Sequence, residues 1–239
     1  MTSLSDKIAI VTGAGRGIGK AIALALAQAG ANVCVAARTQ VEIDRVASEI
    51  ERLGRKVIAV RADVSRESDV NGMVSKAVQK FGTVDILVNN AGVGYFAKVV
   101  DMTAESFDSM WGVNMRGVFL SSRAVLPYMI KQKSGDIVNM SSLAGRNAIV
   151  AGAGYCATKW ALIGFSRSLM LEVRENNIRV ITLCPGSVET AFGDHERTQR
   201  SPGIIPKAEE IAQVAINTLL MPRHVMVSEV DIRPTNPKS

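Results

Sequence analysis

Thr12-Gly13-Ala14-Gly15-Arg16-Gly17-Ile18-Gly19 is the stretch of this sequence that decides the fold. It follows a short β-type run over residues 8–11 and precedes a segment with helical spacing of its apolar residues. A strand, a glycine-rich turn and a helix in that order direct backbone amides and the positive end of a helix dipole at one point, which suits a pyrophosphate. Gly13 would permit the tight turn, Gly17 a close approach of the backbone to the ligand, and Gly19 close packing of the helix. This context favours a dinucleotide site over a glycine-rich turn that binds nothing.

The rest of the chain repeats the alternation of strand and helix. The β-type runs cover residues 8–11, 32–36, 57–60, 84–88, 136–140, 178–183 and 225–232. Several are almost continuously apolar, which is typical of strands buried on both faces. Glycines fall just past the helical segments, at Gly30, Gly54 and Gly82, where helix ends favour them. We therefore predict the α/β class, with residues 1–239 forming a single doubly wound (Rossmann) domain. Its seven-stranded sheet would be mainly parallel, with helices on both faces.

Composition excludes several classes of protein. The chain has 239 residues, of which 47% are hydrophobic and 21% charged, values typical of a folded globular protein and not of a disordered or fibrous one. No apolar stretch is long enough to cross a membrane, and the first seven residues do not resemble a secretory signal. The net charge of +6 comes from scattered basic residues. This distribution suits an anionic cofactor or solubility better than nucleic acid, and we expect neither a nucleic-acid nor a membrane partner.

The cysteines indicate a reducing compartment. Cys34, Cys156 and Cys184 lie far apart, without a CxxC pair or clustered histidines, so we expect neither a metal site nor a disulfide framework. Cys34 and Cys184 lie within apolar runs and should be inert core residues. The simplest location for such a chain is the cytoplasm.

Several further motifs, taken in order along the chain, resemble the short-chain dehydrogenase/reductase family over nearly the whole sequence. They are Thr12 to Gly19, Asp63-Val64, Asn89-Asn90-Ala91-Gly92, Asn114, Ser142, Tyr155-Cys156-Ala157-Thr158-Lys159 and Pro185-Gly186. The glycine spacing alone fits two patterns and does not decide between them. Within the family, the sequence is most similar to the 3-oxoacyl-carrier-protein reductase type.

The resemblance implies a nicotinamide cofactor. The cofactor-binding residues it assigns are Gly13, Gly15, Arg16, Gly17, Ile18, Gly19, Arg38, Asp63, Val64, Asn90, Ala91, Gly92, Tyr155, Lys159, Pro185, Gly186 and Val188. The second strand ends without the carboxylate that would bind the ribose of NAD, and Arg38 stands there instead. With Arg16 in the glycine turn, it could bind a 2′-phosphate, so we predict NADP(H). Asp63 could instead cap a helix, and Asn90 could equally brace the central strands.

Four residues form the predicted catalytic group. Tyr155 and Lys159 are four residues apart on one helical face, where an ammonium would lower the phenol pKa toward neutrality. By the spacing of the family that the sequence resembles, Ser142, at the end of the fifth strand, would hydrogen-bond the substrate oxygen, whereas Ser141 would be structural. The resemblance gives Asn114 the role of kinking a helix and holding a water that relays protons to Lys159.

The predicted enzyme is thus an oxidoreductase that reduces a ketone or aldehyde with NADPH, with Tyr155 as the proton donor. The substrate would be a small molecule or an acyl thioester, since both a 3-oxoacyl thioester and a broad range of carbonyl compounds remain open. A non-catalytic dinucleotide sensor would have a broken catalytic group, and a methyltransferase would not need Tyr155 and Lys159. The segment after Pro185-Gly186 contains no residue diagnostic of a substrate, although residues 186–206 could cover a ligand.

The C-terminal stretch, Ser228 to Thr235, lacks the Asp-Gly-Gly ending common in reductases of this type. In the family this ending contributes to the pocket rim and to subunit contacts. Apolar side chains extend beyond one face of residues 110–130 and of the helix after Tyr155. They would lie either under residues 186–206 or, as the resemblance implies, against a second subunit in a homodimer or homotetramer.

Overall fold

The structure, a computed structural model, describes residues 3–190, 192 and 205–236. It contains one seven-stranded sheet in the order β3-β2-β1-β4-β5-β6-β7, in which every neighbouring pair is parallel. The strands are β1 (Ile8–Thr12), β2 (Asn32–Ala37), β3 (Val57–Arg61), β4 (Ile86–Asn89), β5 (Gly135–Met140), β6 (Ile178–Pro185) and β7 (Glu229–Ile232). The prediction of a doubly wound α/β fold is confirmed, and strand order reverses between β1 and β4.

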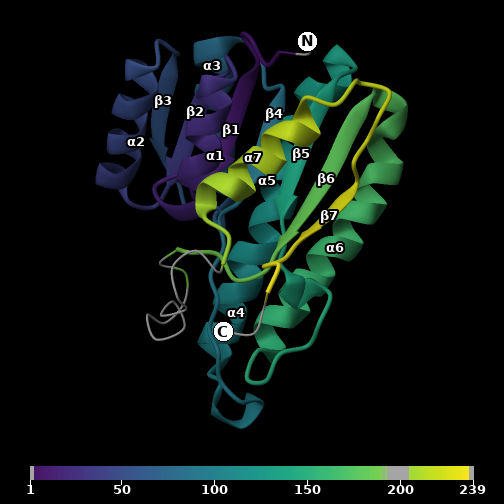
Figure 1. The fold of residues 1–239 in the computed structure, drawn as a ribbon. Helices are drawn as coiled ribbons and strands as arrows, with labels where there is room; N and C mark the ends of the chain where they lie inside the picture. The colour runs from purple at the N-terminus through teal and green to yellow at the C-terminus, as the bar shows by residue number, and fades with distance from the viewer. Residues whose placement is uncertain (1–2, 191, 193–204, 237–239) are drawn as a thin grey trace.

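Helices cover both faces of this sheet (Figure 1). The α-helices are α1 (Gly17–Gln28), α2 (Gln40–Arg52), α3 (Glu67–Phe81), α4 (Ala104–Trp111), α5 (Gly117–Gln132), α6 (Ala153–Val173) and α7 (Ala208–Leu219). Shorter helical turns are η1 (Val99–Asp101), η2 (Gly112–Arg116), η3 (Leu143–Gly145) and η4 (Arg174–Asn176). Helices α1, α2 and α7 pack on one face, and α3, α5 and α6 on the other. Helix α4 lies beyond the edge where the strands end (Figure 1).

Two hydrophobic clusters separate the layers, and strand residues contribute to them alternately. In β1, Ala9 and Val11 face the cluster beneath α1 and α7, whereas Ile10 faces the cluster beneath α3 and α5. All five residues of β1 are buried, as the continuous apolar run predicts. Cys34 and Cys184 are buried in β2 and β6 as predicted, and all three cysteines are free thiols.

The glycines predicted to follow helices do so, whereas the strands predicted over residues 84–88 and 225–232 begin later, at Ile86 and Glu229. Gly82 ends α3 with a φ of 90°, a left-handed conformation that favours glycine. The last strand, however, begins at Glu229 and not at residue 225. Here the Val225 carbonyl accepts a hydrogen bond from Arg179 Nη1 at 3.2 Å, so this oxygen does not join a strand ladder.

The predicted helix around residues 110–130 is two helices joined by a π-helical turn. Helix α4 ends at Trp111, α5 begins at Gly117, and η2 between them carries Asn114. A π-turn widens the helix by one residue and often lies at a functional site. No helix in the described part of the chain is both long and apolar enough to span a membrane.

Candidate active site

A cavity of about 670 Å³ opens at the carboxyl ends of the central strands, where ligands bind in open parallel sheets. Most of the predicted site residues line it: Gly13, Gly15, Arg16, Gly17, Ile18, Arg38, Asp63, Val64, Asn90, Ala91, Gly92, Ser142, Tyr155, Lys159, Pro185, Gly186 and Val188. Gly19 and Asn114 are not among the lining residues and lie behind the cavity wall. The structure thus brings together residues that are up to about 175 positions apart in the chain.

The glycine-rich turn is held so tightly that side chains would not fit. Gly13 has a φ of +63°, and a Cβ there would lie 2.8 Å from the Cα of Ala91. A Cβ on Gly19 would lie 2.3 Å from both the Gly13 carbonyl oxygen and Asn90 Nδ2. Gly19 therefore lets α1 pack against the turn, and Gly17 and Ile18 at the start of α1 line the cavity.

Thr12 and Asn90 join the turn to β4. The Thr12 hydroxyl donates to the Val88 carbonyl and accepts from the amides of Asn90 and Ala91 at 3.1 Å. Asn90 Nδ2 donates to the carbonyl oxygens of Thr12 and Gly13. Asn90 therefore braces β1 against β4, as one interpretation of the sequence predicts, and it also lines the cavity, while its contact with a cofactor stays a prediction.

Arg16 and Arg38 line the cavity on the side of the glycine-rich turn and the end of β2. Arg16 is the N-cap residue of α1, and Arg38 directly follows β2. Burial alone would raise the pKa of Asp63, but hydrogen bonds from Ser65 and the positive charges of Arg38 and Arg66 hold it below its usual value. Asp63 accepts from the Ser65 amide and hydroxyl and does not cap α3, whose N-cap residue is Arg66.

The two serines after β5 point in different directions. Ser141 donates its hydroxyl hydrogen bond to the Lys159 carbonyl at 3.1 Å and is buried against α6. Ser142 hydrogen-bonds with the Tyr155 phenol, and its oxygen accepts from the Ala144 amide at the start of η3. The hydroxyl adjacent to the phenol is therefore that of Ser142.

Tyr155 lies deep in the cavity wall, 8% exposed, between three neighbours. The ring centroids of Phe96 and Phe192 lie 5.3 Å and 5.9 Å from that of Tyr155, and Lys159 Nζ lies 5.7 Å from the same centroid. Burial raises the pKa of Tyr155 to about 12, although the hydrogen bond with Ser142 opposes this shift. The predicted phenol pKa near neutrality is therefore wrong for this arrangement.

Burial of the phenol explains the difference, and Lys159 is buried beside it. Its ammonium donates to the Met140 carbonyl at 2.9 Å and stands over the face of the phenol ring. Burial lowers the pKa of Lys159 to about 8. The removal of the phenol from water therefore outweighs the nearby positive charge.

Asn114 fixes the π-turn against the loop after β4. Its Oδ1 accepts from the Val93 amide at 2.9 Å, and its Nδ2 donates to the Val93 carbonyl at 2.9 Å and to the Thr158 hydroxyl at 3.1 Å. Both ends of the side-chain amide are thus engaged by the protein. The side chain positions the loop and α6, while the predicted water relay stays a prediction.

Sequence reasoning missed the apolar wall beside Tyr155. Phe96, Ile149 and Phe192 all line the cavity. Phe192 belongs to the segment after Pro185-Gly186, for which the sequence predicts no residue diagnostic of a substrate; its place in the cavity wall leaves that prediction untested. The signals were weak, because isolated aromatic residues in loops are common. Most of the segment predicted to cover a ligand, residues 191 and 193–204, lies outside the described residues.

The unusual C-terminal stretch holds η3 in place. Pro234 lines the cavity, and the Gly186 amide donates to the Ile232 carbonyl at 2.8 Å. Arg146, which directly follows η3, pairs with both Glu229 and Asp231 of β7. Arg167 of α6 also binds Glu229, at 2.6 Å, and these arginines hold the pKa of Glu229 down at about 2. The described residues include no cluster of three or more metal-ligating side chains.

The fold is doubly wound α/β, and this cavity lies at its topological switch point, between the two halves of the sheet where the strand order reverses. The profile of the short chain dehydrogenase family matches residues 7–201, and the chain belongs to that family.

Relatives with known sequences and structures align with almost the whole chain. An uncharacterized oxidoreductase of Staphylococcus aureus strain MRSA252 is 35% identical over 98% of this chain and 100% of its own. An alcohol dehydrogenase from the archaeon Thermococcus sibiricus, complexed with 5-hydroxy-NADP, matches with a TM-score of 0.91 and 33% identity, over 98% of this chain and 100% of its own. A 3-ketoacyl-(acyl-carrier-protein) reductase from Brucella melitensis, complexed with NADH, has a TM-score of 0.88 and 34% identity, over 96% and 98% of the two chains.

Proposed function

We propose that this protein, with residues 1–239 as a single catalytic domain, reduces a ketone or aldehyde to an alcohol with NADPH. The observation that carries the proposal is the position of Tyr155, Ser142 and Lys159 in the same cavity as the glycine-rich turn. A sensor that only bound a dinucleotide would not need a phenol hydrogen-bonded with a serine hydroxyl at that place.

The residues present fit a phosphorylated dinucleotide. Gly13 has no room for a Cβ beside Ala91, and Gly17 and Ile18 at the start of α1 line the cavity, where backbone amides at a helix N-terminus suit a pyrophosphate. Arg16 and Arg38 stand at the far end of the cavity, and a guanidinium pair suits a 2′-phosphate. The archaeal alcohol dehydrogenase that binds 5-hydroxy-NADP supports the same choice of cofactor.

When bound, the nicotinamide supplies the hydride that reduces the carbonyl carbon. Tyr155 is protonated at neutral pH and gives its phenolic proton to the carbonyl oxygen, while the Ser142 hydroxyl donates a hydrogen bond to the same oxygen. Lys159 places a positive charge over the phenol ring and stabilises the phenolate that proton transfer creates. Asn114 acts through Val93 and Thr158 as a positioning residue.

The test is NADPH oxidation, followed by absorbance, with a panel of ketones, aldehydes, quinones and 3-oxoacyl thioesters. Tyr155→Phe should bind NADPH as the wild type does, because the phenyl ring keeps its contacts, and should lose nearly all turnover. A Tyr155→Phe variant that kept most of its activity would overturn the mechanism.

We also propose a homodimer or homotetramer working in the cytoplasm. Phe119, Trp160 and Leu171 are 43%, 54% and 55% exposed, so α5 and α6 present apolar side chains to solvent. The free, buried thiols suit a reducing compartment. Sedimentation equilibrium at micromolar concentration should give at least twice the chain mass of 25.5 kDa, and a value equal to one chain would refute the assembly.

A further inference from the structure

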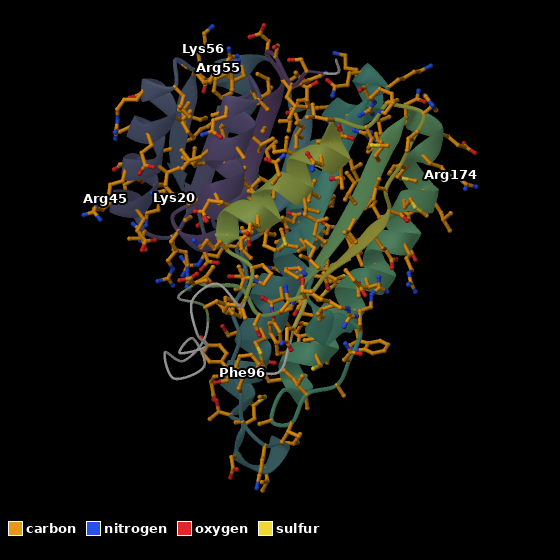
Figure 2. The ribbon with its side chains drawn as sticks, in the orientation of Figure 1. Lys20, Arg45, Arg55, Lys56, Phe96 and Arg174 are labelled. Atoms are coloured by element: carbon orange, nitrogen blue, oxygen red, sulfur yellow. The ribbon has the colours of Figure 1, made fainter. Side chains whose placement is uncertain are left out.

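Two phenylalanine rings flank the phenol of Tyr155 and form a continuous apolar wall. Phe96, in the loop after β4, meets the Tyr155 ring at an interplanar angle of 54°, and Phe192, from the segment after β6, meets it at 51°. Figure 2 shows Phe96 beyond the carboxyl edge of the sheet, away from the labelled basic side chains. The wall therefore stands where the substituents of a carbonyl held by Tyr155 would lie.

Gly94 allows the two rings to converge. A Cβ at this position would lie 3.1 Å from Phe96 Cε2 and 3.1 Å from Phe192 Cε1, closer than ordinary van der Waals contact. The edges of both rings thus reach the same point over the backbone of the loop. Residues far apart in sequence are packed into one surface, which distinguishes this wall from a chance pair of loop aromatics.

Charge is concentrated at the other end of the cavity. Among the described lining residues, the charged side chains are Arg16, Arg38, Glu42, Asp63 and Lys159. Glu42 lies against Gly15 of the glycine-rich turn, and the Arg38 charge acts on Asp63, so these groups surround the cofactor end. Lys159, the charged side chain nearest the phenol, already donates to the Met140 carbonyl. An ionised substituent beside the two rings would lose its water without gaining a partner from this wall.

We propose that Phe96 and Phe192 determine substrate specificity, and that the substrate is a neutral ketone carrying an apolar ring. The inference rests on the proposed carbonyl reduction at Tyr155 and names its substrate class. The ring would pack on the two phenylalanines, where buried apolar area contributes to binding in proportion to its size. A matched ketone carrying a carboxylate would be disfavoured, and so would a 3-oxoacyl thioester, whose linear polar arm matches the wall poorly.

The experiment compares kcat/KM for four carbonyl compounds with saturating NADPH. They are a phenyl ketone, the same ketone with a para-carboxylate, a small aliphatic ketone and a 3-oxoacyl thioester with a short neutral pantetheine-like arm. The wild type should prefer the phenyl ketone over each of the others by at least about 10-fold, within the 10- to 200-fold that apolar pockets provide. NADPH binding, measured by fluorescence, reports the folding of every variant independently of turnover.

Three substitutions locate the effect. Phe96→Ala and Phe192→Ala should each lower kcat/KM for the phenyl ketone about 10-fold and change that for the aliphatic ketone less than about 3-fold. Phe192→Arg should raise the use of the carboxylate ketone relative to the phenyl ketone about 10-fold, because 43% of the Phe192 side chain is exposed and the position can hold a charge. The matched control is Tyr95→Ala, since Tyr95 is also 43% exposed and does not line the cavity.

The outcomes separate the inference from the proposed function. Reduction of the thioester or the carboxylate ketone at least as well as the phenyl ketone overturns the inference and leaves carbonyl reduction standing. Equal losses for all four compounds in Phe96→Ala and Phe192→Ala, with NADPH binding intact, also overturn it, because the rings would then support Tyr155 and not select the substrate. An enzyme that binds NADPH but reduces none of the four compounds overturns both.

Discussion

Replacing Lys159 with methionine should make the protein more stable at neutral pH while abolishing its turnover. Burial lowers the pKa of Lys159 from 10.5 to about 8, so the folded state carries a desolvated charge at pH 7. At about 1.4 kcal/mol per pH unit, this charge costs about 3 kcal/mol of stability. Loss of the hydrogen bond to the Met140 carbonyl would offset about 1 kcal/mol of the gain. The variant should therefore be more stable than the wild type by about 2 kcal/mol at pH 7.

The sign of the effect depends on pH, which provides the decisive measurement. Because the folded pKa is below the unfolded one, the wild type gains stability as pH rises from 8 to 10.5, where the unfolded state binds more protons. The advantage of Lys159→Met should shrink by about 2 to 3 kcal/mol between pH 7 and pH 10. Urea unfolding of both proteins at several pH values measures the difference.

Lys131→Met is the matched control, because Lys131 is exposed and its ammonium stays in water when the chain folds. The stability difference between Lys131→Met and the wild type should change little between pH 7 and pH 10. A difference between Lys159→Met and the wild type that stayed constant from pH 7 to pH 10 would refute the idea of a buried, desolvated ammonium.

Two further predictions concern Arg38, which lines the cavity, and Glu229, which pairs with Arg146 and Arg167. Arg38→Asp should lower kcat/KM with NADPH at least about 10-fold, or about 1.4 kcal/mol, by replacing an attractive contact with repulsion, and should lower that with NADH far less. Initial rates with both cofactors measure this, and equal losses would count against Arg38 as the phosphate-binding residue. Glu229→Gln should lower stability at pH 7 by about 1 to 2 kcal/mol, after allowance for solvent screening around Arg167. Because the pKa of Glu229 is low in the folded state, this stabilisation is full above pH 4.5 and is lost as pH falls toward about 2. Urea unfolding should therefore show a smaller stability difference between Glu229→Gln and the wild type at pH 3 than at pH 7. An equal difference at both pH values would contradict the prediction.

The fold could be predicted because its information is local. Each buried strand is a short apolar run, as Ile8–Thr12 shows, and the glycine-rich turn specifies the strand before it and the helix after it. The prediction failed where a distant side chain intervened. Residues 225–228 have the composition of a strand, but the Val225 carbonyl accepts a hydrogen bond from Arg179, which lies 46 residues earlier in the chain. Similarly, nothing in the spacing of apolar residues distinguishes a π-turn at Gly112–Arg116 from a continuous helix.

The candidate site shows the same difference between what local sequence motifs predict and what distant side chains determine. The family motifs placed most of its residues at one cavity, yet the spacing of Tyr155 and Lys159 could not give the phenol pKa. That property depends on the burial of the phenol in the folded cavity wall, which the local spacing does not reveal. The pairing of Arg146 with β7 was equally hidden, since its partners lie more than 80 residues away.

The buried cysteines make this chain a convenient host for site-specific chemical labels. Alkylating reagents attack thiolates, and burial raises the pKa of Cys34 to about 12 and also raises that of Cys184, so both should be unreactive at neutral pH. Cys156 is buried as well, at 8% exposure. A cysteine introduced at Val100, which is 87% exposed in the helical turn η1, would therefore accept a maleimide fluorophore or spin label without removal of the native thiols. Such a label would stand four residues beyond Phe96 and could report on substrate binding in real time.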